Sequence, residues 1–228
     1  MAPIIPIDFT DMNVLITGGT RGIGKAMSTL FSRLGANVFP INSKDCDFDN
    51  DDIQKFLNEF NNIDILINNA GVNIIDSFAD INDTDFDSVM NVNVKTPYLI
   101  SKHVLNNMVA NKWGRIINIA SVWGTKSISK RASYTTSKAA LIGLTKTMAI
   151  EYAEHGVLIN SISPGFTNTD LTSEILTPDQ IGLMLDKVPM KRMAEPLEIA
   201  NTAAFLCSKY NTYITGQDVV IDGGFLIS

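Results

Sequence analysis

Cysteine and histidine are scarce in this chain of 228 residues, which contains two of each. Cys46 and Cys207 lie far apart in the sequence and form no metal-binding or redox motif, so they fit a reducing compartment. Two histidines, His103 and His155, are too few for a histidine-based zinc site. We therefore expect neither a disulfide nor a bound metal.

Long apolar runs and an excess of basic charge are also lacking. No stretch approaches the roughly 20 apolar residues that span a bilayer, and the N-terminal residues lack the basic and apolar regions of a signal peptide. Acidic residues outnumber basic residues by 24 to 18, which gives a net charge of −6 and argues against nucleic-acid binding. We expect a cytoplasmic protein that binds neither membranes nor nucleic acids.

What the chain does have is a regular alternation of short β-branched runs and longer segments of helical period. The expected strands are 13–17, 37–42, 63–67, 115–121, 157–163 and 217–222. The expected helices are 22–34, 50–60, 83–110, 132–154 and 195–209, with a smaller one near 178–187. This alternation predicts βαβ units and hence one α/β domain over residues 1–228, with a doubly wound parallel sheet.

The connection after the second expected strand is unusually short. Only residues 43–45 separate that strand from the next candidate, at 46–48. A parallel neighbour needs a crossover of about a dozen residues or more. We therefore predict six strands, without a third strand outside the second one and without the helix that would precede it.

A glycine-rich segment, TGGTRGIG at residues 17–24, follows the first expected strand. Its glycines permit a tight turn and a close backbone approach to a ligand, and the helix that follows offers free N–H groups to an anion. No Lys-Ser or Lys-Thr pair follows the last glycine, so the loop is not that of a nucleotide triphosphatase. Its position between strand and helix predicts a dinucleotide site.

The end of the second strand bears on which dinucleotide binds. An NAD site places an acid there to accept hydrogen bonds from the ribose 2′-hydroxyl, whereas this strand ends in the neutral Asn42. Arg21 and Lys44 are both placed to face a 2′-phosphate. These residues favour NADP(H). NAD(H) stays open, because Asp45 or Asp47 could take the place of the acid.

A second group of residues suits acid–base chemistry. Tyr134 and Lys138 lie one helical turn apart, and an ammonium group near a phenol favours the phenolate and lowers its pKa. Ser121 follows a buried strand at the carboxyl edge of the sheet, where such folds bind ligands. Asn93 faces inward from the expected helix 83–110, either as a kink with backbone partners or as an anchor for a water chain to Lys138.

The order of these motifs resembles that of the classical short-chain dehydrogenase/reductase family over about residues 11–228. The second half of the chain is especially similar to bacterial 3-oxoacyl-(acyl carrier protein) reductases. The matching positions are 17–24, 68–71, Asn93, Ser121, Tyr134, Lys138, 164–169 and 221–224. The resemblance implies a Rossmann-like fold, a homotetramer, and hydride transfer between a nicotinamide and a carbonyl carbon.

The resemblance also implies roles for single residues. Tyr134 would protonate the carbonyl oxygen, Ser121 would polarise it, Lys138 would lower the pKa of Tyr134 and hold the nicotinamide ribose, and Asn93 would hold a relay water. Residues 170–194 would form a substrate lid. The implied cofactor contacts are Gly18, Thr20, Arg21, Gly22, Ile23, Gly24, Asn42, Ser43, Lys44, Asp47, Phe48, Asn69, Ala70, Gly71, Tyr134, Lys138, Pro164, Gly165, Thr167 and Thr169.

Two features of the sequence bear on the substrate class. Acyl-carrier reductases use two arginines to dock the acidic carrier; Arg115 matches the first, but His155 stands in place of the second. The loop before Tyr134 is crowded with basic residues, which are either solvated charges or an attraction for a small anionic substrate. These residues are Lys126, Lys130 and Arg131. We predict reduction of a 3-oxoacyl thioester, with a sugar or small hydroxy-acid dehydrogenase and a non-catalytic cofactor-binding scaffold as alternatives.

Overall fold

Parallel strands form one central sheet in the computed structural model, which describes residues 6–48, 53–169 and 178–228. The sheet of this described part has six strands in the order β2-β1-β3-β4-β5-β6, so the predicted doubly wound, Rossmann-like topology is confirmed. The strands are β1 (Asn13–Thr17), β2 (Asn37–Ile41), β3 (Ile65–Asn68), β4 (Gly114–Ile119), β5 (Val157–Pro164) and β6 (Asp218–Ile221).

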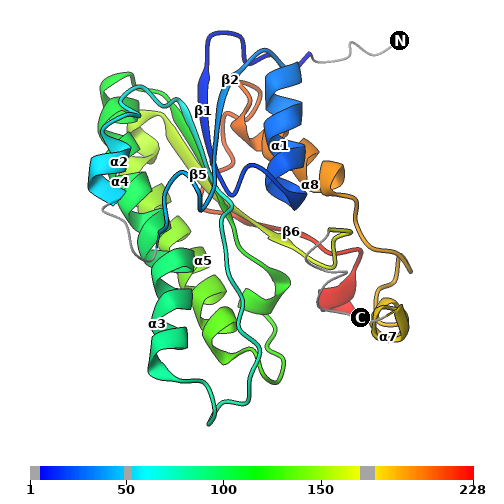
Figure 1. The fold of residues 1–228 in the computed structure, drawn as a ribbon. Helices are drawn as coiled ribbons and strands as arrows, with labels where there is room; N and C mark the ends of the chain where they lie inside the picture. The colour runs from blue at the N-terminus through cyan, green and yellow to red at the C-terminus, as the bar shows by residue number, and fades with distance from the viewer. Residues whose placement is uncertain (1–5, 49–52, 170–177) are drawn as a thin grey trace, which may run out of the picture.

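Helices cover both faces of the sheet (Figure 1). They are α1 (Gly22–Arg33), α2 (Ile53–Leu57), α3 (Asp83–Met90), α4 (Thr96–Ala110), α5 (Ala132–Tyr152), α7 (Pro178–Leu185) and α8 (Pro196–Cys207). Helices α1 and α8 pack on one face, where Phe31 and Ala203 join the core. Helices α2, α4 and α5 pack on the other, around Leu57 and Met108. Because both faces are covered, β3 and β5 are buried along their whole length, as parallel strands usually are.

The predicted interruption after β2 is confirmed. The Asn42 carbonyl accepts hydrogen bonds from the N–H groups of Asp45 and Cys46 at 3.0 and 3.1 Å, and the Asp45 carboxylate accepts one from the Asn42 N–H at 2.8 Å. This tight turn carries the chain to the buried Cys46 and on towards α2. Within the described residues β2 therefore pairs with β1 alone and forms one edge of the sheet.

The expected helix 83–110 is helical over its whole length, but one turn of it is not α-helical. Helix α3 ends at Met90, a single π-helical turn follows at Asn91–Lys95, and α4 starts at Thr96. Helical periodicity does not reveal one wide turn, because the apolar pattern resumes after it. The π turn is where Asn93 enters the core, with no exposed surface.

Two other expectations concern partly described segments. Of the expected helix 50–60, the structure describes a short helix, Ile53–Leu57, and residues 50–52 lie outside the described residues. Of the expected lid 170–194, residues 170–177 lie outside the described residues, and Pro178–Leu185 form α7. In the part of the chain that is described, no helix has the length and hydropathy needed to cross a membrane.

Candidate active site

Ser121, Tyr134 and Lys138 come together at the carboxyl edge of the sheet, as the sequence predicts. Ser121 lies two residues beyond β4, and its hydroxyl lies near the phenol of Tyr134, in the first turn of α5. Lys138 is only 3% exposed. Its Nζ donates to the Ile119 carbonyl at 2.8 Å and lies 5.5 Å from the centroid of the Tyr134 ring. The end of β4 thus positions both the serine and the lysine.

Burial and local charge act in opposite directions at the Tyr134 phenol. Burial raises the pKa of Tyr134, while the Ser121 hydroxyl and the Arg131 guanidinium lower it. Burial also lowers the pKa of Lys138 from 10.5 to about 8. The expectation that Lys138 depresses the pKa of Tyr134 stays a prediction.

Asn93 joins the loop after β3 to helix α5. Its Oδ1 accepts a hydrogen bond from the Val72 N–H at 2.9 Å, and its Nδ2 donates to the Val72 carbonyl and to Ser137 Oγ, both at 2.9 Å. A Cβ atom at Gly71 would lie 3.4 Å from both Asn93 Oδ1 and Lys138 Nζ. The kink with backbone partners is therefore present, and Asn93 also lies close to Lys138, as the relay hypothesis requires. Sequence reasoning missed Ser137, because a serine inside a helix carries no distinctive signal.

The glycine loop is built to receive an anion. Gly18 and Gly22 have φ angles of +63° and +52°, which side chains rarely adopt, and a Cβ at Gly24 would overlap the Gly18 carbonyl. Asn69 Nδ2 donates to the carbonyls of Thr17 and Gly18 at 3.0 and 3.1 Å and so holds the turn. Among the residues that the structure describes, no side chain caps the start of α1, so its first N–H groups stay available to a phosphate. These features fit the pyrophosphate of a dinucleotide.

Thr17, the first residue of the motif 17–24, has a supporting role that the sequence analysis did not assign to it. Its Oγ1 accepts hydrogen bonds from the N–H groups of Asn69 and Ala70, each at 2.9 Å. It thereby joins the end of β1 to the segment after β3, so that the glycine loop lies beside residues 69–71. A threonine at the last position of a buried strand is the signal that could have found it.

The segment after β5 reaches back towards the glycine loop. Pro164 ends β5, and Gly165 lies so close to Asp222 that a Cβ would be 2.8 Å from the Asp222 Cα. Thr167 is buried and forms a bridge to Ala194, and a Cβ at Gly22 would lie 3.4 Å from the Thr169 side chain. The candidate contacts on both sides of the cofactor site are therefore neighbours in space.

At the opposite end of that site, some of the candidate cofactor contacts are exposed, and others are partly buried or form hydrogen bonds within the protein. Thr20, Arg21, Ser43 and Lys44 are exposed. Asn42 Oδ1, in contrast, accepts a hydrogen bond from the Lys44 N–H at 2.8 Å. Asp47 and Phe48 are partly buried, and the Phe48 carbonyl accepts a hydrogen bond from Asn91 Nδ2 at 2.8 Å.

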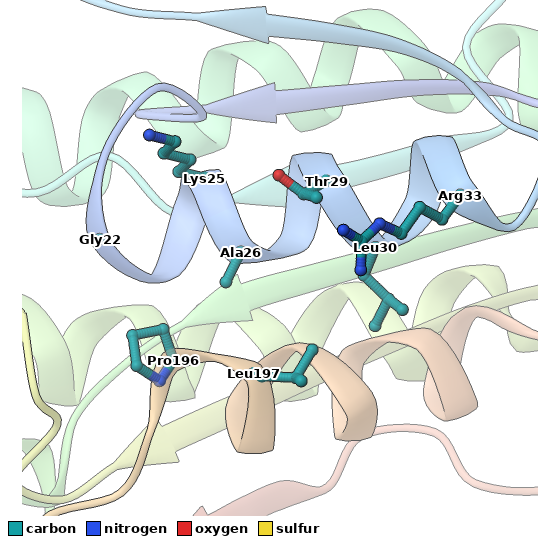
Figure 2. A pocket seen from close by; sticks show the side chains of 8 residues that line it. All are labelled: Gly22, Lys25, Ala26, Thr29, Leu30, Arg33, Pro196 and Leu197. Atoms are coloured by element: carbon teal, nitrogen blue, oxygen red, sulfur yellow. The ribbon is translucent and has the colours of Figure 1, made fainter.

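A groove of about 320 Å³ lies between α1 and α8 and includes Gly22 at one end. Figure 2 shows Lys25, Thr29 and Arg33 along its α1 side and Pro196 and Leu197 opposite them. None of Ser121, Tyr134 and Lys138 lines it, so this groove flanks the glycine loop without being the reaction centre.

Arg115, which the resemblance assigns to carrier docking, is used inside the protein. Its side chain is 5% exposed and donates to the carbonyls of Gly114, Gly156 and Asn211 at 2.8, 3.2 and 3.1 Å. The guanidinium also lies 4.6 Å from the Trp113 ring centroid. The guanidinium is therefore used inside the protein and offers little surface for binding a carrier protein.

Comparison with known proteins agrees with this geometry. A family model described as enoyl-(acyl carrier protein) reductase matches residues 11–226. The chain is 33% identical to the 3-oxoacyl-(acyl-carrier-protein) reductase FabG of Rickettsia typhi, over 97% of this chain and 99% of that protein.

Solved structures of NAD(P)-binding dehydrogenases also match nearly the whole chain. A protein from Beutenbergia cavernae, described as an NAD(P)-dependent gluconate 5-dehydrogenase with bound NADP, matches with a TM-score of 0.93 and 27% identity, covering 98% of this chain and all of that one. A 4-hydroxyisoleucine dehydrogenase complexed with NADH matches with a TM-score of 0.86 and 30% identity, covering 96% and 100%. With its parallel sheet, its glycine loop and its Ser–Tyr–Lys group, the chain belongs to the short-chain dehydrogenase/reductases, the NAD(P)-dependent oxidoreductases that act on CH–OH groups.

Proposed function

We propose that this protein reduces a carbonyl group to a secondary alcohol with NADP(H), and that Asn93, Ser121, Tyr134 and Lys138 form its catalytic group. The Ser121 hydroxyl near the Tyr134 phenol, together with the buried Lys138 Nζ at 5.5 Å from the Tyr134 ring centroid, carries this proposal. When bound, the nicotinamide supplies the hydride. Tyr134 donates the proton to the developing alkoxide, and the Ser121 hydroxyl holds the same oxygen in place.

The protonation state of Tyr134 suits its role as the proton donor in reduction. Because burial raises its pKa, the phenol keeps its proton at neutral pH and can donate it. Lys138 carries a charge at pH 7, since its pKa is about 8. Its three N–H groups allow contact with the cofactor ribose as well as with the Ile119 carbonyl.

The preference for NADP(H) is supported by Arg21 and Lys44, which are exposed and form no ion pair among the described residues. Fluorescence titration with NADPH and NADH tests it. We expect tighter binding of NADPH, and we expect the double variant Arg21→Ala, Lys44→Ala to lose that preference. Tighter binding of NADH that is lost in Asp45→Ala would place the ribose against Asp45 instead.

Two substrate classes have support. The similarity to FabG reductases along the whole chain supports a 3-oxoacyl thioester. The basic loop at Lys126, Lys130 and Arg131, together with the likeness to a gluconate dehydrogenase, supports a sugar acid or small hydroxy acid. The burial of Arg115 removes one argument for the carrier-bound thioester.

We also propose a homotetramer, which light scattering coupled to gel filtration checks.

Turnover of NADPH with acetoacetyl-CoA and with a panel of oxo acids tests the proposed function. Tyr134→Phe should abolish turnover and change NADPH affinity by only a few-fold, because the ring and the lysine remain. Tyr213→Phe is the matched control, since Tyr213 is 96% exposed. Full activity in Tyr134→Phe would contradict the mechanism, and binding of NADPH without any turnover would favour the scaffold alternative.

A further inference from the structure

We infer that Arg131 is the substrate-recognition residue of this site and that it binds the carboxylate of a small oxo acid or hydroxy acid. The inference rests on the proposed function, because it needs hydride transfer beside Tyr134. It goes further by choosing the anionic substrate class over the acyl thioester.

The position of Arg131 directs it towards the reacting atoms. Arg131 is the N-cap residue of α5, and Tyr134 is the third residue of that helix. Side chains at these two positions lie on the same side of a helix start, as in a capping box. The Arg131 guanidinium lowers the pKa of the Tyr134 phenol, so its positive charge acts on the hydroxyl that donates the proton.

Arg131 has no counter-charge of its own. Its side chain is partly buried, and it forms no ion pair and no side-chain hydrogen bond within the described residues. Burial lowers the pKa of Arg131, because the charged guanidinium loses part of its hydration at this position. A partly buried guanidinium without a partner is unfavourable in the empty site, and a carboxylate would satisfy it with two parallel hydrogen bonds.

The other basic residues of the loop are placed differently. Lys126 Nζ lies 4.6 Å from the Phe225 ring centroid. Lys130 is exposed, and its carbonyl accepts a hydrogen bond from the Asp76 N–H at 3.2 Å. Of the three, Arg131 is the one whose charge interacts with Tyr134.

The distribution of charge along the chain agrees with an anionic substrate. Residues 88–150 include Asn93, Ser121, Tyr134 and Lys138, and they contain nine Lys or Arg residues and no Asp or Glu, although the chain as a whole carries −6. The segment that carries the catalytic group is therefore positively charged in an otherwise acidic protein, and positive charge attracts anions.

The reaction balances as a two-electron reduction. The carbonyl carbon of the oxo acid receives a hydride from bound NADPH, and its oxygen receives the proton of Tyr134. The products are the hydroxy acid and NADP⁺, and the carboxylate stays on Arg131 throughout. Because Arg131 and Tyr134 lie in the same helix start, we expect a short oxo acid, with its carboxylate near the carbonyl.

The test compares an acid with its neutral ester. Wild-type protein is assayed with 2-oxobutyrate and 3-oxobutyrate and with the methyl ester of each. We expect the better acid to exceed its ester in kcat/KM, and we expect Arg131→Gln to lower this acid-to-ester ratio by about 10- to 100-fold, the usual effect of losing a charge-assisted hydrogen bond. Arg131→Lys should restore part of the ratio. Lys130→Gln, the neighbouring control, should change it less than threefold.

Other outcomes overturn the inference. If Arg131→Gln lowers acid and ester turnover equally and moves the pH profile to higher pH, Arg131 acts on Tyr134 and not on the substrate. If wild-type protein reduces the esters and acetoacetyl-CoA better than both acids, the inference fails while the proposed function stands. If nothing is reduced, the proposed function fails. Calorimetric titration of NADP⁺-loaded protein with both oxo acids then decides, since equal affinity in wild type and Arg131→Gln refutes the carboxylate site and a tenfold loss in the variant supports it.

Discussion

Replacing the buried lysine by methionine, Lys138→Met, should change how stability depends on pH. The pKa of Lys138 is lowered from 10.5 to about 8 by burial. Between these two values the unfolded chain binds more protons at this position than the native protein, so the native state gains stability as the pH rises. From pH 7 to pH 9.5 this linkage raises the free energy of unfolding of the wild type by about 2 kcal/mol. Lys138→Met lacks this gain.

Urea unfolding of the cofactor-free protein at the two pH values, at one protein concentration, measures the effect. The quantity to compare is the pH-dependent change of wild type minus that of Lys138→Met, because other titrating groups cancel in this difference. The hydrogen bond from Lys138 to the Ile119 carbonyl largely cancels too, since a neutral amine still donates. Equal pH dependence in both proteins would refute the reasoning and would mean that Lys138 keeps its ordinary pKa.

Two further substitutions test the supporting architecture. Gly24→Ala should weaken NADPH binding at least tenfold, because its Cβ would overlap the Gly18 carbonyl. The control Gly143→Ala, which has open space around the new Cβ, should leave NADPH binding unchanged. Equal affinities of the two variants in fluorescence titration would contradict the reasoning. Asn93→Ala should lower the free energy of unfolding by about 3 kcal/mol, because it removes hydrogen bonds to Val72 and Ser137 and leaves buried groups unpaired. A loss below about 0.5 kcal/mol in urea unfolding would show that water replaces the lost hydrogen bonds.

Most of the fold could be predicted from the sequence, because local pattern and connection length determine it. The alternation of elements predicts the parallel sheet, and the three residues at 43–45 exclude an additional outer strand. The π turn at Asn91–Lys95 could not be predicted, since it depends on where the Asn93 side chain finds partners on Val72 and Ser137. Those partners lie far away in the sequence.

The candidate site also has features that the sequence predicts and features that it does not. Spacing brings Tyr134 and Lys138 together, and the position of Ser121 after a strand brings it to them. Charge environment does not follow from spacing: the interaction of Arg131 with the phenol and the burial of Arg115 under three backbone carbonyls both depend on packing. The resemblance matches Arg115 to an arginine that docks the acidic carrier, whereas the structure buries its side chain.

The exposed edge at β2 has a consequence for self-association. A strand that pairs on one side only presents free N–H and C=O groups, to which a strand of another molecule can add. Pro40 lies in this strand and has no N–H group, so the hydrogen-bond ladder that a second chain would need is interrupted there. The proline thus limits aggregation at the place where the short connection leaves the sheet uncovered. A substitution such as Pro40→Val would restore a continuous β-forming edge.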